Sequence, residues 1–371
     1  MQQRCHKLLT GSLGTQRELS SFHFGDHDDT RVYIQGSLHG DELPGMVVGW
    51  HLKQKLRQLE SAGQLNAYIT IVPLANPIAL SQHYQGAHIG RFDQLSGEDF
   101  NRNYPVFGAQ LAGQLENQLT HDSSQNKQLI RKAIQQKLEQ ITPSTELESL
   151  RICLLSLAHD ADLMLDLHCD WEAVPHLYTT PKAWSDIEPL ARYLGTKVQL
   201  LAELSGGEPF DEACYEPWYY LQQHFAKHYP IPLGLKPVTV ELRGVTDVDP
   251  HQAEKDAQAI IDFLIHKGLI QGHVKPLPEL LSPATPLDAC EYVITPVSGV
   301  LLHHAHPGKY IKQGELLARV LNPLTDELTP LTAGIDGIYY ARHWQRFANA
   351  GTLVARIAGK HAIRSGNLLV P

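Results

Sequence analysis

The sequence predicts an α/β domain with helices on the faces of a central sheet, followed by a small all-β domain. In residues 1–271, short apolar segments of strand character alternate with segments of helical periodicity. Residues 272–290 are rich in proline and have no periodicity, as expected of an extended linker. Residues 291–371 contain short strand-like segments, glycines and little helical pattern. A chain of 371 residues suits two such domains better than one compact core.

A strand–loop–helix–strand unit opens the first domain. The segment 31–35 (RVYIQ) is a predicted strand, and the loop 36–45 (GSLHGDELPG) follows it with three glycines. Pro44 suits the first turn of a helix whose apolar residues recur at helical spacing over 46–60. The next strand is predicted at 67–72 (AYITIV). This succession is typical of an α/β sheet.

Two further predicted strands are strongly apolar. The segments 163–167 (LMLDL) and 238–242 (VTVEL) have the leucine and β-branched content of buried central strands. Before them lies the Gln-rich segment 108–143. It has two interpretations, an amphipathic helix that covers the sheet or an insertion near the pocket.

The second domain contains an internal repeat. Residues 298–320 align with 336–357, so that Gly299 matches Gly337. Two such halves predict a small pseudo-symmetric β-barrel or sandwich, which resembles the biotinyl/lipoyl-carrier type. That fold carries its cofactor on a lysine between the halves, whereas the segment 322–335 contains no lysine. We therefore expect a structural or gating module rather than a swinging arm.

Charge and composition argue against several classes of protein. The formal net charge of -9 argues against a nucleic-acid-binding surface. The chain has no apolar run of about 18 residues, so no membrane span is expected, and its N-terminus lacks the apolar core of a secretory signal. Five scattered cysteines without a CxxC pair favour free thiols in a reducing cytoplasm. The oligomeric state stays open, and a homo-oligomer is compatible with the sequence.

A candidate metal site begins in the loop after the first predicted strand. His39 and Glu42 are three residues apart in the motif HGDE, and Gly36 and Gly40 allow the backbone turns that direct both side chains to one point. Imidazole nitrogen and carboxylate oxygen are ligands that zinc prefers. The alternative is a surface loop with a solvated Asp-Glu pair, because 21 histidines make a chance HxxE motif common.

His168 is the third candidate ligand. It follows the apolar strand 163–167, at the carboxyl end where α/β sheets build their sites. Two histidines and one glutamate leave a fourth position open for water, which is the arrangement of a catalytic zinc site. The alternative is a hydrogen bond from His168 to a backbone carbonyl. Competing ligands lie nearby, namely Asp170, His176 and Cys169, the last on the opposite strand face.

Glu241 is the predicted catalytic base. It interrupts VTVEL where an apolar residue is expected, and an ionised carboxylate in a central strand needs compensation. A water molecule at the metal would provide that compensation, and Glu241 would take its proton. The structural alternative is a salt bridge with Arg243, two residues further on and on the same face.

A third cluster of polar residues lies in the segment 91–104 (RFDQLSGEDFNRNY). Arginine binds carboxylates through two parallel hydrogen bonds, and asparagine adds an amide donor. An arginine facing the metal would also stabilise the oxyanion that forms during hydrolysis. A polar loop with ordinary surface arginines is the alternative. The candidates are Arg91, Asp99, Asn101, Arg102, Asn103 and Tyr104.

Together, the motifs HGDE, DxNR, LHxD and VEL resemble the succinylglutamate desuccinylase/aspartoacylase family of the zinc carboxypeptidase-like superfamily. The resemblance covers residues 30–270, and a C-terminal barrel recurs in the family. It implies a mixed, mainly parallel eight-stranded sheet between helices, with one zinc ion per chain. By this resemblance His39, Glu42 and His168 are the zinc ligands, Asp99 is the partner of His39, and Glu241 is the general base and acid.

The resemblance also implies how substrate is held. Asn101 and Arg102 would bind a substrate carboxylate, and Arg91 would polarise the scissile carbonyl, although Arg91 lies further from DxNR than in the commonest form. The predicted function is zinc-dependent hydrolysis of the amide bond of a small N-acyl amino acid. The segment 108–143 and the barrel would narrow access and favour such small substrates. A metallocarboxypeptidase acting on peptide C-termini and a non-catalytic, zinc-stabilised binding protein are the alternatives.

Overall fold

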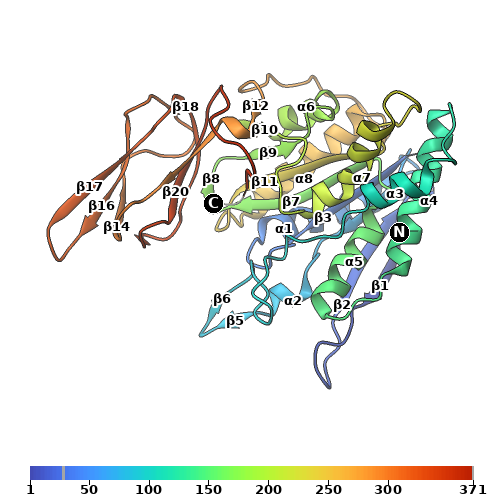
Figure 1. The fold of residues 1–371 in the computed structure, drawn as a ribbon, viewed down its shortest axis with the longest axis horizontal. Coiled ribbons are helices and arrows are strands. Elements are labelled where there is room, and N and C mark those ends of the chain that lie inside the picture. Colours follow the sequence, from blue (N-terminus) through green and yellow to red (C-terminus); the bar gives the residue numbers. More distant parts are fainter. Residues whose placement is uncertain (27–29, 370–371) are drawn as a thin grey trace.

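The computed structural model describes residues 1–26 and 30–369. A large sheet lies between two layers of helices, and the C-terminal strands form a separate body at one end of it (Figure 1). The strands of the large sheet are β1 (Gln2–Lys7), β2 (Glu18–Phe24), β3 (Arg31–Gly36), β4 (Tyr68–Val72), β7 (Leu163–Asp170), β9 (His176–Thr179), β10 (Val198–Leu201), β11 (Lys236–Gly244) and β12 (Thr285–Pro286). Their order is β1-β2-β4-β3-β7-β11-β9-β10-β12.

The sheet is mixed and mainly parallel, as predicted. The central strands β4, β3, β7 and β11 run parallel to one another, and the antiparallel pairs lie outside them. Within the described residues the sheet has nine strands, where the resemblance implied eight. The short edge strand β12 comes from the segment 272–290 that was expected to be a linker, and it pairs in parallel with β10.

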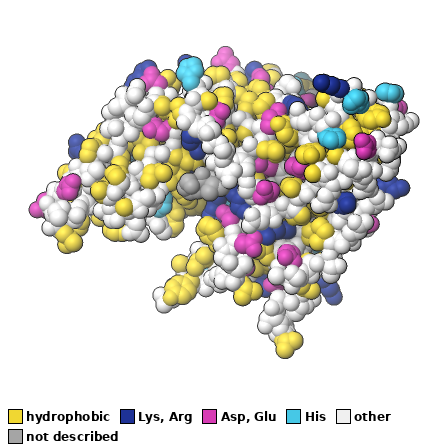
Figure 2. All heavy atoms as spheres, in the orientation of Figure 1, with side chains coloured by type: hydrophobic (Ala, Val, Ile, Leu, Met, Phe, Trp, Pro, Cys, Tyr) yellow, Lys and Arg dark blue, Asp and Glu magenta, His cyan; other side chains and the backbone are white. Residues whose placement is uncertain are grey.

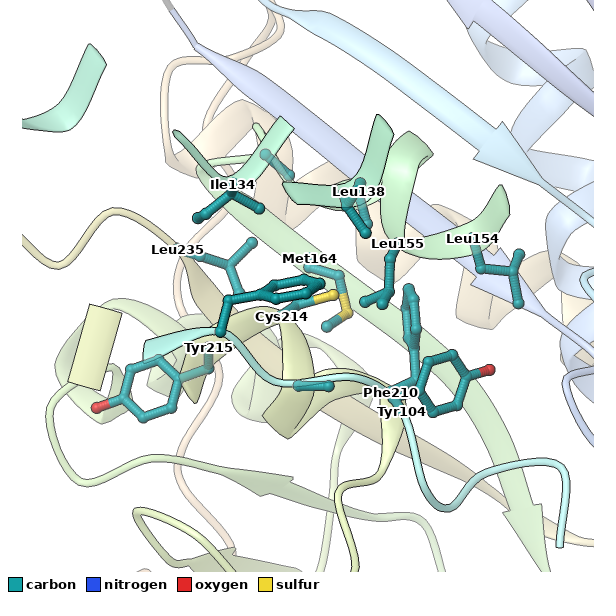
Figure 3. Close-up of a cluster of buried hydrophobic side chains, with 14 of the residues drawn as sticks. Tyr104, Ile134, Leu138, Leu154, Leu155, Met164, Phe210, Cys214, Tyr215 and Leu235 are labelled. Atoms are coloured by element: carbon teal, nitrogen blue, oxygen red, sulfur yellow. The ribbon is translucent and has the colours of Figure 1, made fainter. Parts of the chain in front are cut away.

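Two layers of helices cover the sheet. The helices are α1 (Pro44–Ser61), α2 (Pro77–Leu80), α3 (Gly108–Leu115), α4 (Ser123–Gln140), α5 (Glu146–Ala158), α6 (Trp184–Leu194), α7 (Phe210–Phe225) and α8 (Pro250–His266). One face packs against α1, α6 and α8, and the other against α3, α4, α5 and α7. Figure 3 shows the second layer, in which labelled side chains from α4, α5, α7 and β7 point toward one another. No helix in residues 1–26 and 30–369 is long and apolar enough to cross a membrane.

The Gln-rich segment 108–143 forms α3 and α4 and covers the sheet. Ile130, Ile134 and Leu138 of α4 belong to the buried core that also contains Met164 of β7. The first interpretation of this segment is therefore correct. The alternative, an insertion near the pocket, is wrong, because none of its residues lines the large cavity described below.

Strand alternation sorts the side chains of β7 and β11 between the two faces of the sheet. Leu165 and Val240 point into the core beneath α1 and α8, as period-two alternation requires. Asp166, His168 and Glu241 therefore lie on the opposite face, near the carboxyl ends of parallel strands. This placement brings polar side chains together where α/β sheets usually build their sites.

The C-terminal strands form two small antiparallel sheets. They are β13 (Cys290–Ile294), β14 (Gly299–His303), β15 (Tyr310–Ile311), β16 (Leu316–Asn322), β17 (Glu327–Thr332), β18 (Gly337–Arg342), β19 (Phe347–Ala348) and β20 (Leu353–Ala358). Their orders are β13-β20-β18-β15 and β17-β16-β14-β19. The sequence repeat is visible in this arrangement, because β14 and β16 of one half correspond to β18 and β20 of the other. Each half also sends one short strand, β15 or β19, to the opposite sheet.

The remaining elements are short. The hairpin of β5 (His83–Tyr84) and β6 (Ala87–His88) stands apart from the sheets. The strand β8 (Glu172–Ala173) follows β7 and pairs with β18, so it joins the two parts of the chain. A single turn of 3-10 helix, Leu287–Ala289, precedes β13.

The loop after β3 depends on glycine for close packing rather than for a turn. The left-handed residue there is Ser37 (φ 58°), whereas Gly36 and Gly40 do not have positive φ, so the turn expected at the glycines was misplaced. A Cβ atom on Gly36 would lie 2.7 Å from the carbonyl oxygen of Gly45. Only glycine therefore lets the loop reach the start of α1.

We expect Gly36→Ala to lower the free energy of unfolding by about 1–3 kcal/mol, because the new Cβ must push backbone away from backbone. Urea unfolding measures this change. Gly113→Ala is the matched control, because it lies in α3 with open space around it, and it should leave stability equal or higher. Equal stability of Gly36→Ala and the parent protein would contradict the prediction.

Candidate metal centre and active site

Three predicted ligands converge at the carboxyl end of the sheet. His39 Nδ1 lies 2.7 Å from Glu42 Oε1, and His168 Nδ1 lies 2.8 Å from Glu42 Oε2. One ligand atom of each side chain lies within 4.8 Å of the other two, and all three residues are buried. Among the described residues, they form the one group of His, Cys, Asp and Glu side chains with the spacing of a metal site.

The chemistry of this donor set fits a divalent cation. Burial opposes ionisation of Glu42, but the two neighbouring histidines hold its pKa well below its usual range. A buried carboxylate between two imidazoles is the ligand set that zinc accepts in catalytic sites. His39, Glu42 and His168 can therefore hold such an ion without a change of fold. The surface-loop alternative for HGDE is wrong, because His39 is 2% exposed and Glu42 is 4% exposed.

His39 and His168 each have a carboxylate beside Nε2, the ring nitrogen that does not face Glu42. His39 Nε2 lies 3.0 Å from Asp99 Oδ1, as the resemblance implied. His168 Nε2 lies 3.0 Å from Asp166 Oδ2, a partner that the sequence analysis missed. Gln35 Nε2 donates to Asp166 Oδ1 at 3.0 Å and fixes this carboxylate. The sequence contains a signal for this partner, because Asp166 precedes His168 by two residues and therefore lies on the same face of the strand.

Glu241 lies beside His168 on the neighbouring strand. The two residues are directly paired in the register of β11 and β7. Within the described residues, Glu241 Oε2 is buried and has no hydrogen-bond partner. Burial, followed by the charge of Glu42, raises the pKa of Glu241 to about 8. The salt-bridge alternative with Arg243 is wrong, because Arg243 pairs with Asp256 instead.

The polar loop 91–104 brings its arginines to the same place. Arg91 Nε lies 3.2 Å from Asp99 Oδ2, and its Nη1 lies 3.6 Å from Glu42 Oε1. The side chain of Arg91 is 42% exposed, so it can also contact a bound molecule. Arg102 lines the cavity, and its Nη1 donates to the carbonyl oxygen of Asn101 at 2.7 Å.

Asn101 already has one structural partner. Its Oδ1 accepts the backbone N–H of Phe210 at 2.8 Å, at the first residue of α7. This bond ties the polar loop to the start of the helix. The carboxylate-binding role of Asn101 stays a prediction, with only its amide group left to donate.

A cavity of about 690 Å³ opens onto the metal ligands. Its wall includes residues from both parts of the chain, and in Figure 2 Lys/Arg and Asp/Glu side chains lie next to one another in the hollow between the two parts. The C-terminal part of the chain contributes Tyr292, His343, Gly351, Thr352, Leu353, Arg356 and Leu369. The C-terminal part therefore lies where it can narrow the access of substrates to the cavity, as expected from the sequence.

Arg356 of β20 lines the cavity from the C-terminal part, and it is not among the residues predicted from the sequence. It forms an ion pair with Asp170, two residues after His168. Its guanidinium lies 4.9 Å from the ring centre of Trp171 and 5.4 Å from that of Tyr292. Asp170 therefore pairs with Arg356 rather than with the three candidate ligands, and His176 Nδ1 bonds to the Val174 carbonyl oxygen at 2.8 Å. The competing ligands considered above do not join the triad.

Comparison with known proteins agrees with this fold. The family model of the succinylglutamate desuccinylase/aspartoacylase catalytic domain matches residues 28–267. A family protein of the same description from Shewanella amazonensis is 26% identical, with a TM-score of 0.85 over 96% of this chain and 98% of that one. Another, from Shewanella frigidimarina, is 24% identical, with a TM-score of 0.81 over 96% of both chains.

Solved structures with lower sequence identity share the fold alone. The product-bound ectoine utilization protein EutE (DoeB) from Ruegeria pomeroyi is 16% identical, with a TM-score of 0.67 over 95% of this chain and 94% of that one. Among curated proteins no match is found.

Proposed function

Since the chain belongs to the succinylglutamate desuccinylase/aspartoacylase family, we propose that it is a zinc-dependent amidohydrolase that deacylates a small, carboxylate-bearing N-acyl amino acid. One observation carries the proposal. Glu241, one oxygen of which has no hydrogen-bond partner among the described residues, lies beside a buried His39–Glu42–His168 triad that lines the cavity. A structural metal site has no open position for water and does not need a carboxylate that accepts a proton. The position of Glu241 therefore argues against a non-catalytic binding protein.

The residues around the triad divide the work of hydrolysis. His39, Glu42 and His168 would hold a divalent cation, which would supply Lewis acidity to the scissile carbonyl and to water. Glu241 takes the proton of the attacking water and returns it to the leaving nitrogen. Arg91, exposed beside Glu42, donates hydrogen bonds to the negative charge that develops on the carbonyl oxygen.

A substrate panel with metal analysis tests this proposal. Zinc-loaded protein should hydrolyse at least one of a set of N-acetyl and N-succinyl amino acids, and a chelator should abolish the activity. Short peptides form the second arm, and faster release of their C-terminal residues would assign the protein as a metallocarboxypeptidase. Stoichiometric zinc without hydrolysis of any amide would overturn the proposal.

Arg102 is the proposed anchor of the substrate carboxylate, because its side chain lines the cavity beside the metal ligands. We expect Arg102→Gln to lower kcat/KM by about 100-fold, chiefly through KM, since a charge-assisted bidentate contact is lost. Arg319→Gln is the matched control, because Arg319 occupies the position equivalent to Arg356 in the other repeat and is exposed. A substrate whose carboxylate is replaced by a carboxamide should be insensitive to Arg102→Gln. Equal loss with both substrates would refute the anchor.

A further inference from the structure

One side of the cavity carries three carboxylates, which we call the acidic wall: Glu203, Asp211 and Glu212. Each accepts a hydrogen bond from a neutral donor. The Tyr215 hydroxyl donates to Glu203 at 2.6 Å, the Thr239 hydroxyl donates to Asp211 at 2.9 Å, and the backbone N–H of Ser205 donates to Glu212 at 2.6 Å. Within residues 1–26 and 30–369, none of the three forms an ion pair with a cationic side chain.

Two other carboxylates at the cavity have cationic partners, unlike those of the acidic wall. Asp170 has Arg356, and Asp99 has Arg91. In the acidic wall, burial and then the charge of Asp211 raise the pKa of Glu212 to about 7. Uncompensated negative charge at a partly buried surface is costly, and a cation brought by a ligand would relieve it.

A second observation points to a ligand at the same place. Ser205 is 1% exposed and lines the cavity, and its hydroxyl oxygen has no hydrogen-bond partner within the described part of the chain. The backbone N–H of Ser205 donates to Glu212, so the Ser205 hydroxyl lies beside the acidic wall. A buried polar group without a partner in the protein is a position where a bound molecule gains a hydrogen bond.

The opposite charge lies close by. Arg102 has two carbonyl oxygens as partners, those of Asn101 and Leu369, and no carboxylate among the described residues. Its loop runs beside the segment that leads into α7, because Asn103 N–H bonds to the Gly207 carbonyl at 3.0 Å. Among the residues that the structure describes, the cavity therefore presents a cation and an acidic wall at neighbouring positions, each without a partner of opposite charge.

We infer that the amine half of the substrate is an amino acid with a cationic side chain, whose carboxylate binds Arg102 and whose ammonium or guanidinium group binds the acidic wall. The substrate class is then an Nα-acylated diamino acid or arginine, rather than an acylated acidic amino acid. This inference rests on the proposed deacylase function for the acyl half. The binding of the amine half can be measured separately.

The kinetic test compares side chains of equal length and different charge. Nα-acetyl-L-ornithine and Nα-acetyl-L-norleucine differ by an ammonium in place of a methyl group, and Nα-acetyl-L-glutamate carries the opposite charge. The zinc-loaded protein should hydrolyse the ornithine compound with a kcat/KM at least about tenfold above that of the norleucine compound, and the glutamate compound should be the poorest. An equal or better rate with norleucine or glutamate overturns the acidic wall as a cation site.

The binding test does not depend on turnover. Calorimetric titration of the free amino acids should show tighter binding of L-ornithine than of L-norleucine, to zinc-loaded and metal-free protein alike. Tighter ornithine binding without any hydrolysis would defeat the proposed deacylation and leave the acidic wall supported. Hydrolysis of acetyl amino acids without a preference for ornithine, in rate or in binding, would support the proposed deacylation and overturn the acidic wall as a cation site.

Two conservative variants locate the effect. Glu203→Gln and Glu212→Gln keep an oxygen for the Tyr215 hydroxyl and the Ser205 N–H, but remove the charge. Each should reduce the ornithine-to-norleucine ratio of kcat/KM several-fold. Glu254→Gln on α8 removes one charge from an exposed position and should leave the ratio at the parental value. An unchanged ratio in both cavity variants would overturn the assignment.

Discussion

Changing Glu241 to Gln leaves metal binding intact and lowers kcat by about 1000-fold, because the variant keeps the shape of the side chain and loses its ability to accept a proton. The residue is well placed for this effect. It pairs with His168 across β11 and β7 and has a buried oxygen without a partner among the described residues. Metal content by elemental analysis and turnover of an N-acyl amino acid measure the two halves of the prediction.

A stability measurement separates the catalytic role from a structural one. Burial raises the pKa of Glu241 to about 8, so ionisation of this carboxyl costs free energy in the metal-free protein once pH exceeds the ordinary value for glutamate. Metal-free Glu241→Gln should therefore melt at the same temperature as the parent or higher at neutral pH. The control Glu188→Gln, which changes a surface pair with Arg192, should keep full turnover. A parental rate in Glu241→Gln would refute the assignment of the base.

The convergence of His39, Glu42 and His168 could be predicted because its signals are local. His39 and Glu42 share one glycine-containing loop after β3, and His168 lies near the end of the very apolar strand β7. The carboxyl ends of parallel strands meet at one edge of the sheet, so three local patterns were enough to place three side chains together. Asp166 has a period-two relation to His168, but an aspartate between leucines indicates only a strand and does not by itself predict a partner for the imidazole.

The rest of the cavity could not be predicted from local patterns. Arg356 reaches Asp170 because β8 pairs with β18, and this long-range contact joins residues more than a hundred positions apart. The sequence repeat does not predict the contact of Arg356 with Asp170, because Arg319, the equivalent residue in the other half, is exposed. The acidic wall has the same origin. Glu203 precedes α7 and Asp211 lies in its first turn. The helix α7 packs against β11, and both carboxylates line the cavity.

The short strand β8 also explains why the C-terminal part sits at the cavity rather than away from it. Glu172 forms ion pairs with Arg342 and Arg346, and both contacts lie on the strand that follows β7 directly. The end of β7 therefore carries a proposed metal ligand, the partner of Arg356 and the attachment of the C-terminal strands within a few residues. The fold couples the position of the C-terminal part to the shape of the site.

His168→Ala should remove stoichiometric zinc binding and lower activity by about 1000-fold or more, because two remaining ligands cannot hold the ion in place. Asp166→Asn tests the same site more gently. It keeps the size of the side chain but weakens the acceptor beside His168 Nε2, so zinc affinity should fall by about 10–100-fold with activity restored by excess zinc.

The control for both variants is His273→Ala, an exposed histidine in the segment 272–290, which should bind zinc like the parent. Competition with a chelating dye gives the three affinities on one scale. The order parent, Asp166→Asn, His168→Ala follows from the geometry, since the aspartate acts on the metal only through the imidazole. Parental zinc affinity in His168→Ala would place the ion elsewhere and remove the physical basis for Glu241 as the base. Activity of Asp166→Asn that excess zinc fails to restore would instead make Asp166 part of the chemistry rather than a support for its ligand.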